Sequence, residues 1–102
     1  MNKILQQLID FRKKRDWEKY HSGLTLSHKL CIESAELAEL FEWGKRPDKQ
    51  RLSEELADVR IILEYLAHDN GINLDEAVKM KIKMNEEKYP IKDYPEWKEA
   101  IK

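Results

Sequence analysis

Two pairs of acidic residues carry the clearest chemistry in this sequence, because each pair has the spacing of neighbours on a helix. Glu33 is followed three residues later by Glu36, and Glu55 is followed three residues later by Asp58. Residues three apart lie about one turn apart on the same helical face. If the two segments are helices that pack face to face, the four carboxylates converge on one point.

The position of each pair around its helix is unusual for acidic residues. With about 3.6 residues per turn, Glu33 and Glu55 each fall in the middle of an apolar stripe, and Glu36 and Asp58 lie at the edges. The stripes consist of Leu26, Leu30, Leu37, Leu40 and Phe41, and of Leu52, Val59, Ile62, Leu63 and Leu66. The same arrangement therefore occurs twice. Pairs such as Glu36 with Glu39, by contrast, are typical of a solvated surface.

Carboxylates brought together in an apolar interface need a counter-charge, because burying unpaired like charges is unfavourable. A divalent cation removes this cost. Oxygen ligands without Cys or His favour Mg²⁺, with Mn²⁺ as a possible substitute. The pattern therefore predicts a metal site, against the alternative that a chain with 20 acidic residues contains such pairs by chance. The predicted ligands are Glu33, Glu36, Glu55 and Asp58.

The elements that must position these residues read as helices joined by short turns. We expect helices over about 2–20, from a cap at Thr25 or Ser27 to Trp43, from near Asp48 or Ser53 to about Asp69, and from Asn73 to before Pro90, with a short last helix through Trp97 and Ile101. Gly44 and Asn70-Gly71 are typical helix stops. The prediction is one all-α domain over residues 1–102, an antiparallel four-helix bundle with a short C-terminal helix.

The fourth expected helix places two polar residues inside its apolar stripe. Lys81 and Asn85 fall among Leu74, Val78 and Ile82. A cation and an amide that face inward would complement the carboxylates or an anionic ligand held by them. The alternative for Lys81 is a salt bridge to an acidic residue of the second or third helix.

Composition excludes several classes of function. The chain has 102 residues, with 19 basic and 20 acidic residues and a net charge of -1, which disfavours nucleic-acid binding. Hydrophobic residues make up 41%, too many for a disordered chain, yet the apolar runs are too short for a membrane span. Cys31 is the only cysteine and the N-terminus has no secretory stretch. A reducing, cytoplasmic location is therefore expected.

The motif Glu33-x-x-Glu36 followed by Glu55-x-x-Asp58 resembles the signature of the MazG-like superfamily of all-α nucleotide pyrophosphohydrolases. Residues 15–21, 36–43, 54–59 and 81–90 further resemble segments of its dCTP pyrophosphatase branch. Two positions depart from that branch. Lys29 is more typical of the wider superfamily, and Ile62 stands where the branch tends to have a tyrosine against the sugar.

The resemblance implies Mg²⁺-dependent hydrolysis of a nucleoside triphosphate to the monophosphate and pyrophosphate. A dCTP-like or modified pyrimidine substrate and a role in nucleotide-pool sanitation are favoured. The four carboxylates would be metal ligands, and a metal-bound water would attack the α-phosphorus in line. Glu33 or Glu36 would act as the base. The remaining substrate contacts would be Trp17, His21, Lys29, Trp43, Lys81 and Asn85, with Lys81 also stabilising the leaving group.

The resemblance also implies a homodimer or homotetramer. A second apolar side on the second expected helix, at Cys31, Ile32, Ala35 and Ala38, favours the same interpretation. Two further hypotheses stay open. The chain could be a non-catalytic helical interaction module of the same fold, or a pyrophosphohydrolase for a non-canonical nucleotide. The basic residues of the first helix, including Arg12 and Lys19, could contact phosphates or pair with acidic neighbours.

Overall fold

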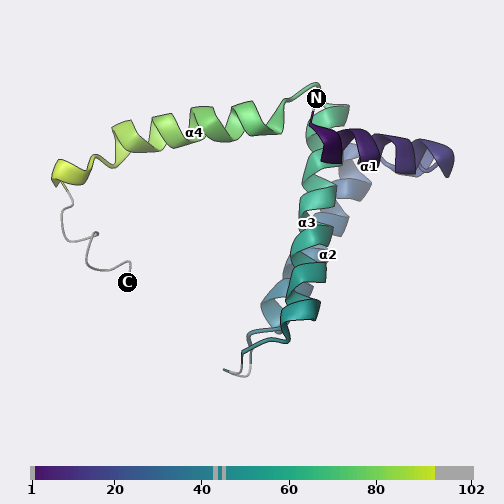
Figure 1. Cartoon of the computed structure of the whole chain (residues 1–102), viewed down its shortest axis with the longest axis horizontal. Helices are drawn as coiled ribbons and strands as arrows, with labels where there is room; N and C mark the ends of the chain where they lie inside the picture. Colours follow the sequence, from purple (N-terminus) through teal and green to yellow (C-terminus); the bar gives the residue numbers. More distant parts are fainter. Residues whose placement is uncertain (1, 43, 45, 94–102) are drawn as a thin grey trace. The chain divides into compact units, whose positions relative to one another are not determined.

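The computed structural model describes residues 2–42, 44 and 46–93, and these form two compact units within residues 1–71 and 72–102. The first unit contains helices α1 (Lys3–Lys14), α2 (Gly23–Glu39) and α3 (Lys49–Asp69), and the short 3₁₀ helix η1 (Glu18–Tyr20). The second contains α4 (Leu74–Lys88) and the 3₁₀ helix η2 (Ile91–Asp93) (Figure 1). The described part of the chain contains no strand, and the four predicted long helices are all present.

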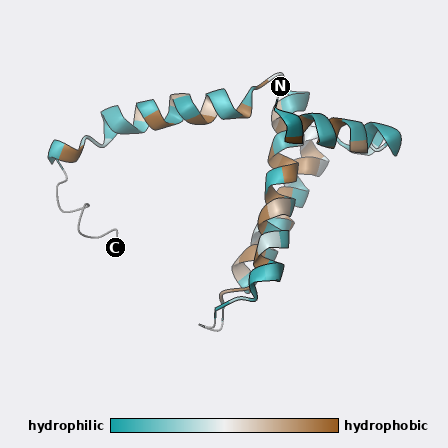
Figure 2. Cartoon of the chain, in the orientation of Figure 1, coloured by the Kyte–Doolittle hydropathy of each residue, from teal (hydrophilic) through white to brown (hydrophobic). Residues whose placement is uncertain are grey.

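Helices α2 and α3 form an antiparallel hairpin, and they start where side chains can cap them (Figure 1). The predicted cap of α2 at Thr25 or Ser27 is wrong, because the helix begins at Gly23 and Ser22 is its cap; Thr25 completes a reciprocal capping box with Ser22. The Asp48 carboxylate accepts a hydrogen bond from the backbone of Arg51 at the start of α3. Along every helix hydrophobic and hydrophilic residues are interspersed, as expected for helices with one apolar face (Figure 2).

The core of the first unit lies where the two predicted stripes meet. Leu26, Ile62 and Tyr65 are buried, and Leu8, Leu30, Ile61 and Leu66 pack against them. Phe41 and Leu63, which the stripes also included, are exposed at 51% and 38% because they lie at the stripe edges. The stripes therefore identify the α2–α3 interface correctly and overestimate its width.

The prediction that the first helix reaches Tyr20 is wrong, because α1 ends at Lys14. Asp16 has a φ of 54°, in the left-handed region that short polar residues tolerate better than most. The Trp17 amide donates to the Arg12 carbonyl at 3.1 Å across this turn. The 3₁₀ helix η1 follows, and the residues that flank it, Trp17 and His21, lie beside the α2–α3 hairpin.

The predicted end of the second helix at Trp43 is four residues too far, since α2 ends at Glu39 and leads into a turn. Gly44 in that connection has a φ of 68°, a conformation that glycine adopts without strain. Trp43 itself lies outside the described residues. The starts of α3 at Lys49 and α4 at Leu74 agree with the predicted caps at Asp48 and Asn73.

Helix α1 lies across the end of the hairpin where α3 finishes, and two polar contacts hold it there. The Tyr65 hydroxyl donates to the Leu8 carbonyl at 2.8 Å. The Arg12 guanidinium donates to both carboxylate oxygens of Asp69, at 2.9 and 2.7 Å. A two-point arginine–carboxylate pair fixes direction as well as distance, so α1 is held in one orientation on α3.

The described part of the second unit consists of α4 and η2. The Asn73 side chain caps α4 by accepting from the Glu76 amide at 3.1 Å, and α4 ends before Pro90 as predicted. No residue of α4 is buried. The predicted last helix through Trp97 and Ile101 lies outside the described residues. Within the described ranges, no helix is both long and apolar enough to cross a membrane.

Candidate active site

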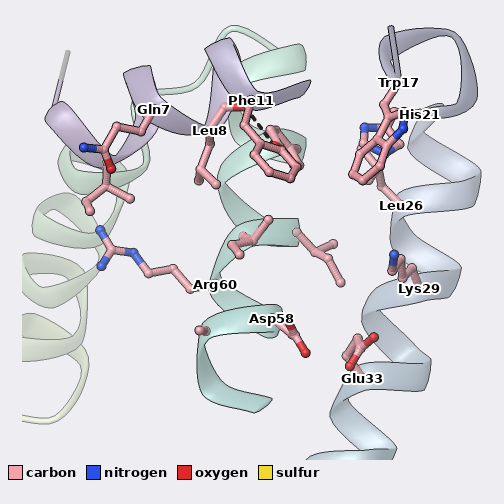
Figure 3. Close-up of a pocket in the computed structure, with 15 residues that line it drawn as sticks. Gln7, Leu8, Phe11, Trp17, His21, Leu26, Lys29, Glu33, Asp58 and Arg60 are labelled. Carbon is pink, nitrogen blue, oxygen red and sulfur yellow. Dashed lines mark hydrogen bonds between the residues drawn. The ribbon is translucent and has the colours of Figure 1, made fainter. Parts of the chain in front are cut away.

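Three of the four predicted carboxylates converge, one from α2 and two from α3. One oxygen each from Glu33, Glu55 and Asp58 lies within 4.8 Å of the other two. Glu33 and Asp58 face each other across the two helices (Figure 3). Glu33 and Glu55 are half-buried and Asp58 is exposed. Two central acids and one acid at the edge therefore share one focus.

Two oxygens at this focus lack the partners that buried polar atoms ordinarily have. Oε2 of Glu33 and Oε2 of Glu55 are both buried, and neither has a hydrogen-bond partner among the described residues. A third acid close by increases the electrostatic cost. A divalent cation would satisfy these oxygens, and oxygen-only donors fit Mg²⁺ or Mn²⁺. The residues present therefore fit the predicted metal.

Glu36 is exposed and lies close enough to these acids for their charges to act on its pKa. The pKa of Glu36 is raised, first because its carboxyl can share a hydrogen bond with Glu33 and then because the Glu33 charge disfavours ionisation. Slight desolvation and the charge of Asp58 act in the same direction, whereas a hydrogen bond with Glu55 opposes them. Glu36 is not one of the three acids whose oxygens share the focus, so its predicted role as a metal ligand stays a prediction.

A cleft of about 790 Å³ opens beside the carboxylates within the first unit. Glu33 and Asp58 lie at one end, and Lys29 lies one helical turn before Glu33 on the same wall (Figure 3). Trp17 and His21 lie at the other end. The cleft thus joins an acidic end, a cationic side chain and an aromatic end.

The aromatic end is built from α1 and the segment that follows it. The rings of Phe11 and Trp17 meet edge to face with centroids 5.5 Å apart. Each of these side chains is 43% exposed. The Arg15 guanidinium lies 3.7 Å from the centre of the Phe11 ring, which supports that ring. Accessible, ordered aromatic faces of this kind suit a flat ligand such as a nucleobase.

His21 is held between charged groups from three helices. Burial lowers its pKa most, followed by the charge of Arg12. Asp69 raises the pKa and Lys29 lowers it further. Because the net effect is a pKa below the ordinary 6.5, His21 is neutral at neutral pH.

The predicted substrate contacts fall into three groups. Trp17, His21 and Lys29 all line the cleft. Lys81 and Asn85 lie one turn apart on α4, which belongs to the second unit, so their predicted roles stay predictions. Trp43 lies outside the described residues.

Several residues of the cleft were not predicted from sequence as site residues, among them Phe11, Arg60 and Tyr65. Phe11 and Tyr65 lie at apolar spacings that signalled only packing. Arg60 is an exposed helical arginine without a local sequence signal, and its nearest acidic partner in the described chain is Glu64 at 3.9 Å. Two basic residues that could have contacted phosphates pair with acids instead: Arg12 of α1 pairs with Asp69, and Lys19 of η1 pairs with Asp16 at 3.0 Å.

Comparison with known families agrees with the motif. The sequence profile of the MazG-like family matches residues 26–101, which include all four carboxylates. The chain belongs to the MazG-like family. This confirms the resemblance inferred from the spacing of the acids.

Relatives of this MazG-like chain include dCTP pyrophosphatase 1 of Mus musculus, 39% identical over 92 residues, and its Homo sapiens counterpart, 38% identical over 91 residues. The matches cover 80% and 79% of this chain and 54% of each relative. The chain therefore spans about half the length of these relatives.

A solved structure is also similar: the crystal structure of a pyrophosphatase from Archaeoglobus fulgidus, with a TM-score of 0.74 and 40% sequence identity. The match covers 85% of this chain and 89% of that one. The predicted all-α, MazG-like fold is therefore confirmed.

Proposed function

We propose that this protein hydrolyses a nucleoside triphosphate to the monophosphate and pyrophosphate with Mg²⁺, and that it acts on a dCTP-like or modified pyrimidine nucleotide in the cytoplasm. The observation that carries the proposal is the focus of Glu33, Glu55 and Asp58 oxygens within 4.8 Å at one end of an aromatic cleft. Membership of the MazG-like family and relatives named dCTP pyrophosphatase support the reaction.

The layout of the cleft supports a nucleotide as its ligand. A triphosphate needs a cation and positive side chains, and a base needs a flat apolar surface. The carboxylates provide the place for the cation, Lys29 lies beside them, and Trp17 lies at the opposite end. The phosphates would therefore lie toward Glu33 and Asp58, and the base toward Trp17.

The reaction then follows from the positions of these groups. When bound, Mg²⁺ supplies positive charge that neutralises the triphosphate and polarises its phosphorus. A carboxylate of α2, Glu33 or Glu36, takes the proton of the attacking water. The water oxygen bonds to the α-phosphorus. The bond between the α-phosphorus and the oxygen that bridges the α- and β-phosphates breaks, and this oxygen leaves with pyrophosphate. Lys29 stabilises the charge that develops on the phosphates.

The residues of α4 complete the proposal. Lys81 and Asn85 would contact the phosphates from a fourth helix, as the family resemblance implies. Apolar side chains of α4 such as Val78 and Ile82 are exposed. Exposed apolar residues also occur on α2, including Ile32 at 58%. Both observations support a homodimer or homotetramer, which light scattering after size exclusion would test.

A nucleotide panel tests the activity. The purified protein is incubated with canonical and modified triphosphates in Mg²⁺, pyrophosphate and orthophosphate are measured separately, and the nucleotide product is identified by mass. We expect equal amounts of pyrophosphate and monophosphate, with a pyrimidine deoxynucleotide preferred. Asp58→Asn should remove the activity and Glu54→Gln should retain it, since Glu54 is an exposed acid on the same helix. Release of orthophosphate, or no release from any nucleotide, would contradict the proposal.

A further inference from the structure

Four polar and aromatic side chains meet where α1 crosses the end of α3, away from the carboxylate focus. At their centre is Arg12, which is 4% exposed. It donates to both carboxylate oxygens of Asp69, at 2.9 and 2.7 Å, and its guanidinium carbon lies 4.5 Å from the centre of the Tyr65 ring. An arginine held by a two-point ion pair and by an aromatic face has little rotational freedom.

The remaining contact of Arg12 is directed at His21. Nη1 of Arg12 lies 3.5 Å from Nδ1 of His21. A guanidinium has hydrogen-bond donors and no acceptor, so Nδ1 of His21 must accept in this pair. The ring also packs on Tyr65, with centroids 5.4 Å apart. A neutral imidazole that accepts at Nδ1 carries its hydrogen on Nε2.

We propose that Arg12 is a positioning residue, held by Asp69, that fixes His21 as the Nε2–H tautomer and makes it a hydrogen-bond donor toward the cleft. This inference rests on the proposed function. The acceptor for the Nε2–H group of His21 would be an oxygen on the nucleoside half of the substrate. His21 lies at the aromatic end beside Trp17, away from Glu33 and Asp58 (Figure 3). A base carbonyl or a sugar hydroxyl is therefore the chemistry it would recognise.

The charges around His21 agree with a neutral donor. Arg12 approaches from α1, Lys29 from α2 and Asp69 from α3, and Tyr65 packs on the ring. Asp69 alone would favour a charged imidazole, but its carboxylate is engaged by Arg12 through two hydrogen bonds. Arg12 therefore both supplies the donor to Nδ1 and offsets the Asp69 charge that would otherwise stabilise a protonated ring.

The tautomer of His21 is tested first in the unaltered protein, without any activity assay. Two-bond ¹H–¹⁵N correlation spectra of the full chain at neutral pH distinguish the two neutral tautomers and the charged ring. We expect the Nε2–H form. An Nδ1–H form or a doubly protonated ring at that pH would overturn the inference, whether or not the protein hydrolyses nucleotides.

The effect on substrate is tested with Arg12→Met, with Lys19→Met as the control that removes another cation from the same segment. For Arg12→Met we expect mixed His21 tautomers and a KM for dCTP that rises in inverse proportion to the remaining Nε2–H fraction, about twofold for an equal mixture, with an unchanged kcat. Arg12→Lys retains donors and should keep the Nε2–H form and most of the affinity. Lys19→Met, which loses the exposed pair with Asp16 and the contact of Lys19 with the Tyr20 ring, should leave both readouts unchanged.

Two comparisons separate the inference from its alternatives. Two results for Arg12→Lys would refute the link between Arg12 and the cleft. One is a lower kcat with unchanged affinity for dCTP. The other is unchanged affinity for dCTP together with a different His21 tautomer. A dideoxy analogue of dCTP, which lacks the sugar 3′-oxygen, identifies the acceptor: loss of the Arg12 effect assigns the sugar, and its persistence assigns the base. Failure of all nucleotides as substrates would refute the proposed function, while the tautomer spectra would still decide the role of Arg12.

Discussion

Neutralising Glu33 should stabilise the metal-free protein and remove its response to magnesium. Charges 4.8 Å apart, the limit within which the three carboxylate oxygens lie, repel by about 1 kcal/mol in water and about 3 kcal/mol at an effective dielectric of about 20. Asp58 is exposed and the other two acids are half-buried, so the lower value applies. Glu33 takes part in two of these pairs, and its removal relieves about 2 kcal/mol.

The isosteric variant Glu33→Gln should therefore be more stable than the unaltered protein without metal and less stable with Mg²⁺, a crossover that melting temperatures can measure. In excess chelator its melting temperature should exceed that of the unaltered protein by about 4–8 °C for each kcal/mol relieved, as expected for a domain of this size. With Mg²⁺ at about 100 times its dissociation constant the unaltered protein gains about 2.7 kcal/mol. The variant gains much less, so the order of the two melting temperatures should reverse.

Thermal unfolding followed by far-ultraviolet circular dichroism, with and without Mg²⁺, measures the crossover. Glu54→Gln is the matched control, because it removes one exposed charge from the neighbouring position of α3. It should shift neither the metal-free melting temperature nor the Mg²⁺ response. A Glu33→Gln variant that is less stable without metal and keeps the full Mg²⁺ response would refute the reasoning.

Three further predictions follow from contacts in the first unit. The hydrogen bonds from Arg12 lower the pKa of Asp69 below its ordinary 3.8. The stability from this pair is therefore present above pH 3.8 and is lost as the pH falls through the pKa of the folded state. The melting temperatures of Asp69→Asn and the unaltered protein should become equal at that acidic pH. Tyr65→Phe loses the hydrogen bond to the Leu8 carbonyl and should cost about 1 kcal/mol in urea unfolding. Trp17→Ala should raise the KM for dCTP about tenfold, from loss of about 1–3 kcal/mol of stacking, with a smaller change in kcat.

The carboxylate site could be predicted from sequence because a helix converts spacing directly into direction. Glu33 and Glu55 are central in their stripes, and the stripes must face each other to bury Leu26 and Ile62. No long-range information is needed for that step. The same logic placed the cap at Asn73 and gave Asp48 as one of two starts for α3, and both act through neighbouring backbone amides. It did not find the cap of α2 at Ser22.

The aromatic end could not be predicted in the same way. It depends on the turn at Asp16, where a left-handed φ of 54° ends α1 early and redirects Trp17. A continuous helical spacing through this segment gives no sign of the break. The contact of Arg12 with Asp69 likewise joins residues 57 apart in the chain, and an arginine on a charged helix has many possible partners. Such contacts are set by the crossing of α1 on α3, which local pattern does not determine.

Direct binding of Mn²⁺, followed by the electron paramagnetic resonance of the free ion, tests the central claim that acids of α2 and α3 hold a divalent cation. The account predicts saturable binding that Mg²⁺ displaces, that is lost in Glu33→Gln and in Glu55→Gln, and that is retained in Glu54→Gln. Binding that is absent from the unaltered protein, or that persists undiminished in both Glu33→Gln and Glu55→Gln, would contradict it.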